Sequence, residues 1–462
     1  MGQRSREIDQ TKRIDIYLTL ESPFTMQKNK KDIYYTNLFF TYIFLLYQII
    51  TALIVHIDLR GRFVSLAIII CLLYNWKNNK LWKQLILSKP ILIWGLWCLF
   101  TSLNSIIQGH RIYNGVNDSP IIWNEDIFYI QIIFRQLITM TTVCWLYIQN
   151  PPKTVKHLAI IFTITAITTF LFDTSREDWG GETRFGAIMG NNAALMMISF
   201  VFILMLAWTK KLFKRSYIIA GIVLAIGLIL AIQTRKAFIA IIIILIFSYL
   251  TKIKTKNPIT WLLLPLGIII FASISDYIIE NTSIGSRFAT IEDQAQNSNP
   301  TNIPILDLLG DRAIHVYLGW EIWLEHPICG VGLQNAPYYS HLPFIFHQEY
   351  IGQLAENGII GFCLLIIFFY SIIKIIINTI SINKNRPTVF ICLGFMIAIL
   401  FICLSAWIYQ FAHYFAIFGI IIGECKNQSY IKNAKDRFHW LSIRRRKRAQ
   451  DGRTHQVFIP NK

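Results

Sequence analysis

Arginine and histidine are the residue types in this sequence whose positions point to chemistry. Arg235 lies in a Gln-Thr-Arg-Lys turn between two long apolar stretches. Because a guanidinium group forms bidentate hydrogen bonds with phosphate, Arg235 is a candidate anion-binding residue at a membrane edge. The alternative interpretation is that its side chain only reaches toward the lipid headgroups.

His347 stands in a His-Gln-Glu-Tyr segment directly before another apolar stretch. An imidazole has an ordinary pKa of about 6.5, so His347 is a candidate general base near neutral pH. Glu349 and Glu356 are the candidate supporting residues, and a purely structural histidine is the alternative. The histidines of this region do not have the spacing of metal ligands, so the sequence predicts no metal site.

The elements that position these residues are predicted to be membrane helices. Of the 462 residues, 54% are hydrophobic and 15% are charged, and the mean hydropathy is +0.46. A typical soluble domain has about 25% charged residues, so a soluble enzyme is excluded. The net charge of +18 sits in short runs between apolar stretches and in a basic tail. That placement indicates contact with lipid headgroups and excludes nucleic acid as a partner.

Apolar stretches of about 20 residues predict about twelve transmembrane helices, and hence an all-α polytopic membrane protein. The candidate spans are 37–57, 62–76, 85–107, 127–148, 156–173, 186–207, 217–234, 237–251, 259–276, 355–378, 387–407 and 408–423. The last two are interpreted as a tight helical hairpin, and a single long helix is the alternative. 

Lysine and arginine collect at the N-terminus, at 210–215, at 252–256 and in the tail, which predicts that both termini are cytoplasmic. The large segment 277–350 has only two basic residues, Arg287 and Arg312, beside eight acidic ones, so it is predicted to be external. The chain is predicted to begin with a cytoplasmic leader at 1–36, followed by a first transmembrane bundle of about nine spans at 37–276. An external catalytic loop at 277–354 comes next. About three final spans at 355–423 and a basic cytoplasmic tail at 424–462 complete the predicted division.

An interfacial helix is expected inside the external loop. Apolar residues recur at helical spacing from Ala313 to Leu324 and include two tryptophans and a tyrosine, which suit the bilayer surface. Pro327, Gly330 and Gly332 are expected to end this helix. A helix of this kind without any catalytic role is the alternative.

Two glycine-containing motifs complete the pattern. They are His-Pro-Ile-Cys-Gly-Val-Gly at 326–332 and Ala-Glu-Asn-Gly-Ile-Ile-Gly at 355–361. With the Gln-Thr-Arg turn and the external loop, they resemble the O-antigen ligase and O-antigen polymerase superfamily of bacterial inner-membrane glycosyltransferases. The resemblance covers about Thr183 to Gly361. It implies a multi-pass protein of the inner (cytoplasmic) membrane with an active site facing the periplasm.

The resemblance also implies roles for individual residues. Arg235 and Arg312 match the essential arginines of the ligases and would bind the substrate diphosphate, and His347 matches the essential histidine. Arg184 matches a polar family segment less closely, and Arg287 is a rival to Arg312. The family commonly has His-Asn where this chain has His-Gln. The reaction is thought to need no metal and no cofactor.

The predicted function is transfer of O-antigen from an undecaprenyl diphosphate carrier to a sugar hydroxyl of lipid A–core. The partners would be the lipid-linked O-antigen, the lipid A–core acceptor and the phospholipid bilayer. An O-antigen polymerase or a protein O-oligosaccharyltransferase of the same superfamily is the first alternative. A transporter is the second, although Arg135 is almost the only charge within a predicted span that would favour it.

Overall fold

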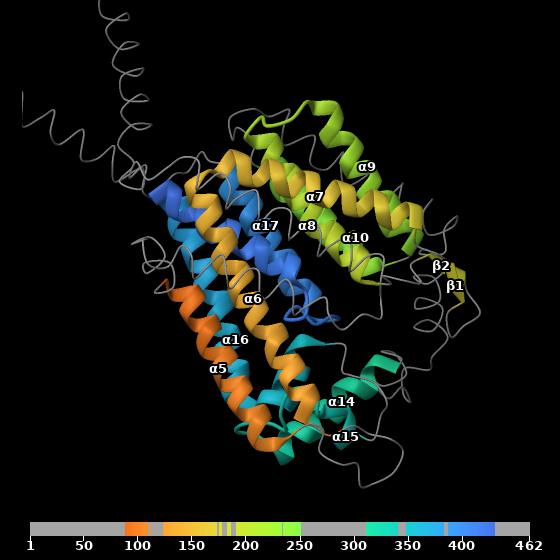
Figure 1. Ribbon diagram of the computed structural model, residues 1–462, viewed down its shortest axis with the longest axis vertical. Helices are drawn as coiled ribbons and strands as arrows, with labels where there is room; N and C mark the ends of the chain where they lie inside the picture. The colour runs from red at the N-terminus through yellow and green to blue at the C-terminus, as the bar shows by residue number, and fades with distance from the viewer. Residues whose placement is uncertain are drawn as a thin grey trace, which may run out of the picture.

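The described part of the chain consists almost entirely of helices. The computed structural model describes residues 88–109, 111, 123–172, 175–177, 183–185, 191–232, 234–250, 311–340, 348–382 and 387–429. The helices are α5 (Lys89–Gln108), α6 (Trp123–Gln149), α7 (Pro151–Phe172), α8 (Asn191–Thr209), α9 (Arg215–Ile232), α10 (Arg235–Leu250), α14 (Asp311–Glu325), α15 (Ala336–Ser340), α16 (Glu349–Ile382) and α17 (Pro387–Ile402). A further helix covers 412–429. Figure 1 shows their arrangement.

Four of these helices are long and apolar enough to cross a membrane. They are α5, α9, the stretch Pro151–Leu171 of α7 and the stretch Glu349–Ser381 of α16. Shorter apolar helices lie within α8, α10 and α17. The predicted count of about twelve spans stays a prediction. The candidate spans 37–57, 62–76 and 259–276 lie outside the described residues, as do the leader at 1–36 and the tail beyond residue 429.

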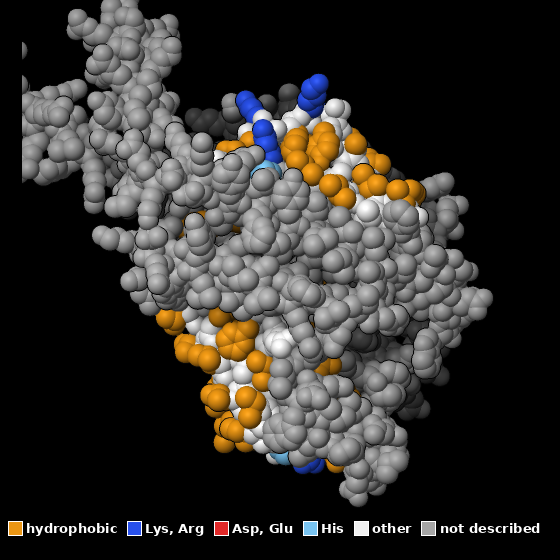
Figure 2. All heavy atoms as spheres, in the orientation of Figure 1, with side chains coloured by type: hydrophobic (Ala, Val, Ile, Leu, Met, Phe, Trp, Pro, Cys, Tyr) orange, Lys and Arg blue, Asp and Glu red, His pale blue; other side chains and the backbone are white. Residues whose placement is uncertain are grey.

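α5 shows how the sequence divides a helix between protein and lipid. Leu96, Leu99 and Leu103 are 47–60% exposed, whereas Trp94 and Trp97 on the opposite side are completely buried. The exposed leucines are three or four positions apart, so they form one apolar stripe. Apolar side chains are visible on this surface in Figure 2, at the lower left where α5 lies in Figure 1. An outward apolar stripe of this kind suits contact with lipid.

The helices pack in two groups joined by α17 (Figure 1). α5 packs against α6 and α16, while α8 packs against α7 and α9. α10 lies along α17, and α14 packs on α16 at one end of the molecule. 

The segment 387–423 forms a helical hairpin, as predicted. The Thr388 hydroxyl donates a 2.7 Å hydrogen bond to the Glu424 carboxylate. Farther along, the rings of Phe395 and Phe418 are 6.2 Å apart. Residues early in α17 therefore contact residues late in the helix at 412–429, which is the antiparallel pairing of a hairpin and excludes one long helix.

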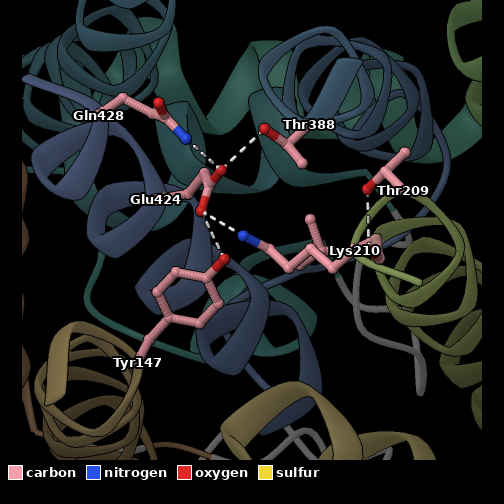
Figure 3. Close-up of polar contacts among 7 residues, drawn as sticks. Tyr147, Thr209, Lys210, Thr388, Glu424 and Gln428 are labelled. Atoms are coloured by element: carbon pink, nitrogen blue, oxygen red, sulfur yellow. Dashed lines mark hydrogen bonds and ion pairs between the residues drawn. The ribbon is translucent and has the colours of Figure 1, made fainter. Parts of the chain in front are cut away.

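A buried carboxylate joins three helices and the turn after α8 at the open end of this hairpin (Figure 3). Glu424 Oε2 accepts hydrogen bonds from Tyr147 Oη at 2.5 Å and from Lys210 Nζ at 3.0 Å. Its Oε1 accepts from Thr388 Oγ1 at 2.7 Å and from Gln428 Nε2 at 2.9 Å. Because Lys210 belongs to a basic loop predicted to be cytoplasmic, this cluster would lie at the cytoplasmic end of the bundle.

Two features differ from the sequence prediction. α16 begins at Glu349, before the predicted span 355–378, because its first turns are too polar to be recognised as membrane helix. A two-stranded antiparallel hairpin, β1 (Ser175–Glu177) and β2 (Thr183–Phe185), follows α7 and adds a small sheet to a fold predicted to be all helical.

Candidate functional site

The two glycine-containing motifs fold into one unit. α16 is interrupted at Gly358, where φ is 58°. In an uninterrupted helix, the carbonyls of Ala355 and Glu356 would accept hydrogen bonds from the amides four positions later. Here Ala355 accepts from the N–H of Val331 at 3.0 Å, and Glu356 accepts from the N–H of Gly332 at 2.8 Å. The first motif therefore takes the place of the missing helical turn.

The amides released by the break bond back to the same motif. The N–H of Ile359 donates to the carbonyl of Pro327 at 2.9 Å, and the N–H of Ile360 donates to the carbonyl of Ile328 at 3.3 Å. The break in α16 thus leaves these backbone groups paired, as buried backbone groups require. We call residues 326–332 together with 355–361 the motif unit.

Glycine is required at two positions of the motif unit. A Cβ atom at Gly330 would lie 2.5 Å from the carbonyl carbon of Glu356, and one at Gly358 would lie 2.3 Å from the carbonyl oxygen of Ile328. Both glycines also have positive φ angles, of 67° and 58°, which other residues adopt at a cost. The two sequence motifs contain glycine at these positions because their backbones meet there.

The polar end of α5 holds the motif unit in place. Asn104 Nδ2 donates to the carbonyls of Cys329 at 2.6 Å and Glu356 at 3.2 Å. The Ser105 hydroxyl accepts from the N–H of Leu333 at 3.0 Å. Sequence reasoning missed these two residues. The signal available was the pair of polar residues at the end of an otherwise apolar span.

Asn335 fixes the turn that follows the first motif. Its Nδ2 donates to the carbonyl of Gly109 at 2.6 Å and to that of Val331 at 2.8 Å. Its Oδ1 accepts from the N–H of Arg111 at 2.9 Å. The side chain therefore ties the motif unit to the segment that leaves α5.

Glu349 and Glu356, the two candidate supporting carboxylates, are both buried at the start of α16. Glu349 Oε2 accepts from the backbone N–H of Ile408 at 2.7 Å, and Oε1 accepts from Gln353 Nε2 at 3.2 Å. The carboxyl group of Glu356 is hydrogen-bonded to the backbone of Gln334. Among the described residues, Oε1 of Glu356 has no hydrogen-bond partner.

α14 confirms the predicted helix in the loop and shows a two-sided surface. Tyr317, Trp320 and Leu324 are 46–60% exposed, whereas Ile322 is buried against the protein. The exposed residues follow helical spacing, as expected of a helix at a bilayer surface. A hydrogen bond to Glu321 and the negative charge of that residue raise the pKa of the Tyr317 hydroxyl, so this ring stays neutral.

The match with known proteins falls on this region. Residues 220–366 match a family model described as O-Antigen ligase. This part of the chain is similar to the O-antigen ligase family. The resemblance carried by the motifs is thereby confirmed, since the matched residues include the whole motif unit. A comparison with curated proteins gave no match.

The matched O-antigen ligase region also contains the three predicted catalytic residues. Arg235 is the first residue of α10, and Arg312 is the second residue of α14. Both therefore lie in the first turn of a helix, where the helix dipole favours anions. His347 lies outside the described residues, two positions before the start of α16.

The remaining candidate arginines differ in their placement. Arg287 is inside the O-antigen ligase region but outside the described residues. Arg184 precedes the region and lies in β2, directly opposite Arg176 of β1. Sequence reasoning missed Arg176, because only the strand register brings it to Arg184.

Metal ligands are not grouped in the described residues. No set of three or more histidine, cysteine, aspartate or glutamate side chains there has the arrangement of a metal site. Metal independence remains a prediction from the family resemblance.

Proposed function

We propose that the protein is an O-antigen ligase of the bacterial inner membrane. It would transfer O-antigen polysaccharide from undecaprenyl diphosphate to a sugar hydroxyl of lipid A–core on the periplasmic face. The observation that carries the proposal is the O-antigen ligase match over residues 220–366, which contains the motif unit and the predicted catalytic residues. Both termini would be cytoplasmic.

The arginines would act on the leaving group. The diphosphate gains negative charge as the glycosidic bond breaks, and fixed cations stabilise that charge most strongly when they are already in place. Arg235 and Arg312 are proposed for this role, and their first-turn positions support it, because helix N-termini also attract anions. Arg287 remains the rival to Arg312, and Arg184 is a weaker candidate for the same diphosphate.

His347 would serve as the general base. It would remove the proton from the acceptor hydroxyl as that oxygen attacks the anomeric carbon, a contribution of typically about 10²–10⁴-fold. No metal or cofactor is needed in this scheme, because the arginines supply the positive charge and the histidine accepts the proton.

The bilayer would present both lipid-linked substrates to the site. The exposed apolar face of α14, at Tyr317, Trp320 and Leu324, supports this arrangement, because such a face is suited to the headgroup region. A site beside this helix could receive the diphosphate of a lipid carrier without removing its polyprenyl tail from the membrane.

A complementation experiment tests the assignment. A ligase-deficient strain that still makes its polymer receives the wild-type gene or His347→Ala, and lipopolysaccharide is analysed by gel and O-antigen immunoblot. The ligase proposal expects a core-linked ladder with the wild type and only lipid-linked polymer with the variant. Rescue of chain length in a polymerase-deficient strain, without ligation, would favour the polymerase. No effect in either strain would favour the transporter.

A further inference from the structure

The 403–411 loop, which joins α17 to the helix at 412–429, contacts three elements that carry or adjoin the proposed site. It reaches the beginning of α10, the beginning of α16 and the turn after the first motif. These elements are far apart in the chain, so a single loop that bonds to all three can fix their relative positions.

Glu349 binds the loop at two positions, its first residue Cys403 and Ile408. The backbone N–H of Glu349 donates to the carbonyl of Cys403 at 3.0 Å. Its carboxylate Oε2 accepts from the N–H of Ile408 at 2.7 Å. One residue therefore binds two positions of the loop, five residues apart, to the start of α16, two positions after His347 in the chain.

The Glu349 side chain is fully buried, and its carboxylate accepts hydrogen bonds from the backbone N–H of Ile408 and from the side-chain amide of Gln353. Burial of a carboxylate is unfavourable unless its hydrogen bonds compensate. Gln353 is itself held through Oε1, which accepts from Asn357 Nδ2 at 2.9 Å. We call the hydrogen bonds of Glu349 to Cys403 and Ile408 the clamp. The side chains of Gln353 and Asn357 support the clamp along α16 as far as the residue before the Gly358 break.

The second contact reaches α10. Lys236 Nζ donates to the carbonyl of Ser405 at 2.7 Å. Lys236 directly follows Arg235, so this bond connects the loop to the residue next to the proposed diphosphate-binding arginine.

The third contact reaches the turn after the first motif. Gln334 Nε2 donates to the hydroxyl of Tyr409. The Tyr409 ring stacks on Trp407, with centroids 5.4 Å apart, and also lies near Trp97 of α5. Aromatic packing of this kind restricts the loop to one position.

We propose that the 403–411 loop is the scaffold that fixes the start of α10, where Arg235 lies, relative to the start of α16, two positions after His347 in the chain, and that Glu349 is its positioning residue. This inference rests on the proposed function, since it assigns Arg235 and His347 to one transfer reaction. Glu349 acts through the loop and does not touch the reacting atoms. A misplacement of about 1 Å in a catalytic group can cost about 10²-fold in rate.

The test compares two buried carboxylates in the full-length protein in nanodiscs. Glu349→Gln keeps the size of the side chain but replaces one acceptor oxygen by an amide donor. Glu424→Gln makes the same change in the cluster of Figure 3, which lies at the open end of the hairpin whose closed end is the 403–411 loop. The donor is an undecaprenyl-diphosphate-linked glycan, and the acceptor is lipid A–core. The measurements are kcat, KM, and deuterium exchange of residues 403–411.

The proposal predicts that the two variants differ in kcat and in the deuterium exchange of the loop. Glu349→Gln should lower kcat by about tenfold to about 10²-fold with KM changed by less than about threefold, and the loop should exchange faster. Glu424→Gln should keep kcat per folded molecule and the exchange of the loop. Equal kcat values in wild type and Glu349→Gln, or equal losses in both variants, would overturn the proposal.

A second variant covers the case in which Glu349→Gln fails to fold. Tyr409→Phe retains the aromatic packing and removes only the hydroxyl that accepts from Gln334. It should lower kcat severalfold, and an unchanged kcat would contradict the scaffold. If the wild type transfers no glycan at all, the proposed function fails. The clamp then stands or falls on exchange alone, which must rise in Glu349→Gln and not in Glu424→Gln.

Discussion

The backbone N–H of Ile359 donates a 2.9 Å hydrogen bond to the carbonyl of Pro327, across the break that Gly358 makes in α16. This bond is one half of an exchange in which two sequence motifs complete each other's backbone hydrogen bonding. The motif unit joins the end of α14 to the start of α16. It therefore fixes α14, which contains Arg312, against α16, which begins two positions after His347.

Gly358→Ala and Gly330→Ala are expected to disrupt the motif unit. Each new Cβ would lie within 2.5 Å of a backbone atom, and each residue would need a positive φ. The strained φ alone costs about 1–2 kcal/mol. Thermal unfolding in detergent should shift to lower temperature, and activity should be lost.

Gly227→Ala is the matched control for these substitutions. It lies in α9, where a Cβ would meet nothing within 4 Å. Alanine is favoured over glycine in a helix interior by about 0.5–1 kcal/mol, so the control should be as stable as the wild type or more so. A control that destabilises as much as Gly358→Ala would contradict the steric explanation.

Lys210→Met should destabilise the bundle. Glu424 would remain buried without its cation, and removing one partner of a buried pair costs about 3–5 kcal/mol. Lys210 is 20% exposed, so solvent screening should bring the effect to the lower end of that range. Chemical denaturation would measure it. Lys374→Met, which changes an exposed lysine of α16, should have almost no effect, and a similar loss in both would argue against the ion pair.

Substitution of the arginines separates the candidates for the diphosphate. Arg235→Lys keeps the charge but loses bidentate hydrogen bonding, so it should retain only part of the activity. Arg235→Ala and Arg312→Ala should each lower kcat by about 10²–10³-fold, which is typical of removing one preorganised donor. If Arg287→Ala has the larger effect and Arg312→Ala has none, the roles of these two loop arginines are reversed.

Removal of metal ions should leave the reaction unchanged. The proposed mechanism stabilises the leaving diphosphate with arginine side chains. Dialysis against EDTA followed by assay in chelator should therefore give the wild-type rate. A loss of activity that added Mg²⁺ or Mn²⁺ restores would show that a metal ion takes part.

The sequence predicted the helical hairpin at 387–423 and the helix over 313–324, because apolar spacing and helix-ending residues are local signals. It also identified both motifs of the unit. It did not predict that Gly330 and Gly358 meet, because that contact depends on which backbone groups the break in α16 releases. Asn104 and Arg176 were missed for the same reason, since their partners are remote in the chain or set by strand register.

The most direct test of the account is a transfer assay with purified wild-type protein and His347→Ala in nanodiscs, using undecaprenyl-diphosphate-linked O-antigen and lipid A–core. The account predicts a core-linked product with the wild type and a rate at least about 10²-fold lower with the variant, because the general base is lost. A His347→Ala protein that ligates at the wild-type rate would contradict the proposed mechanism. A wild-type protein that forms no core-linked product would contradict the ligase assignment itself.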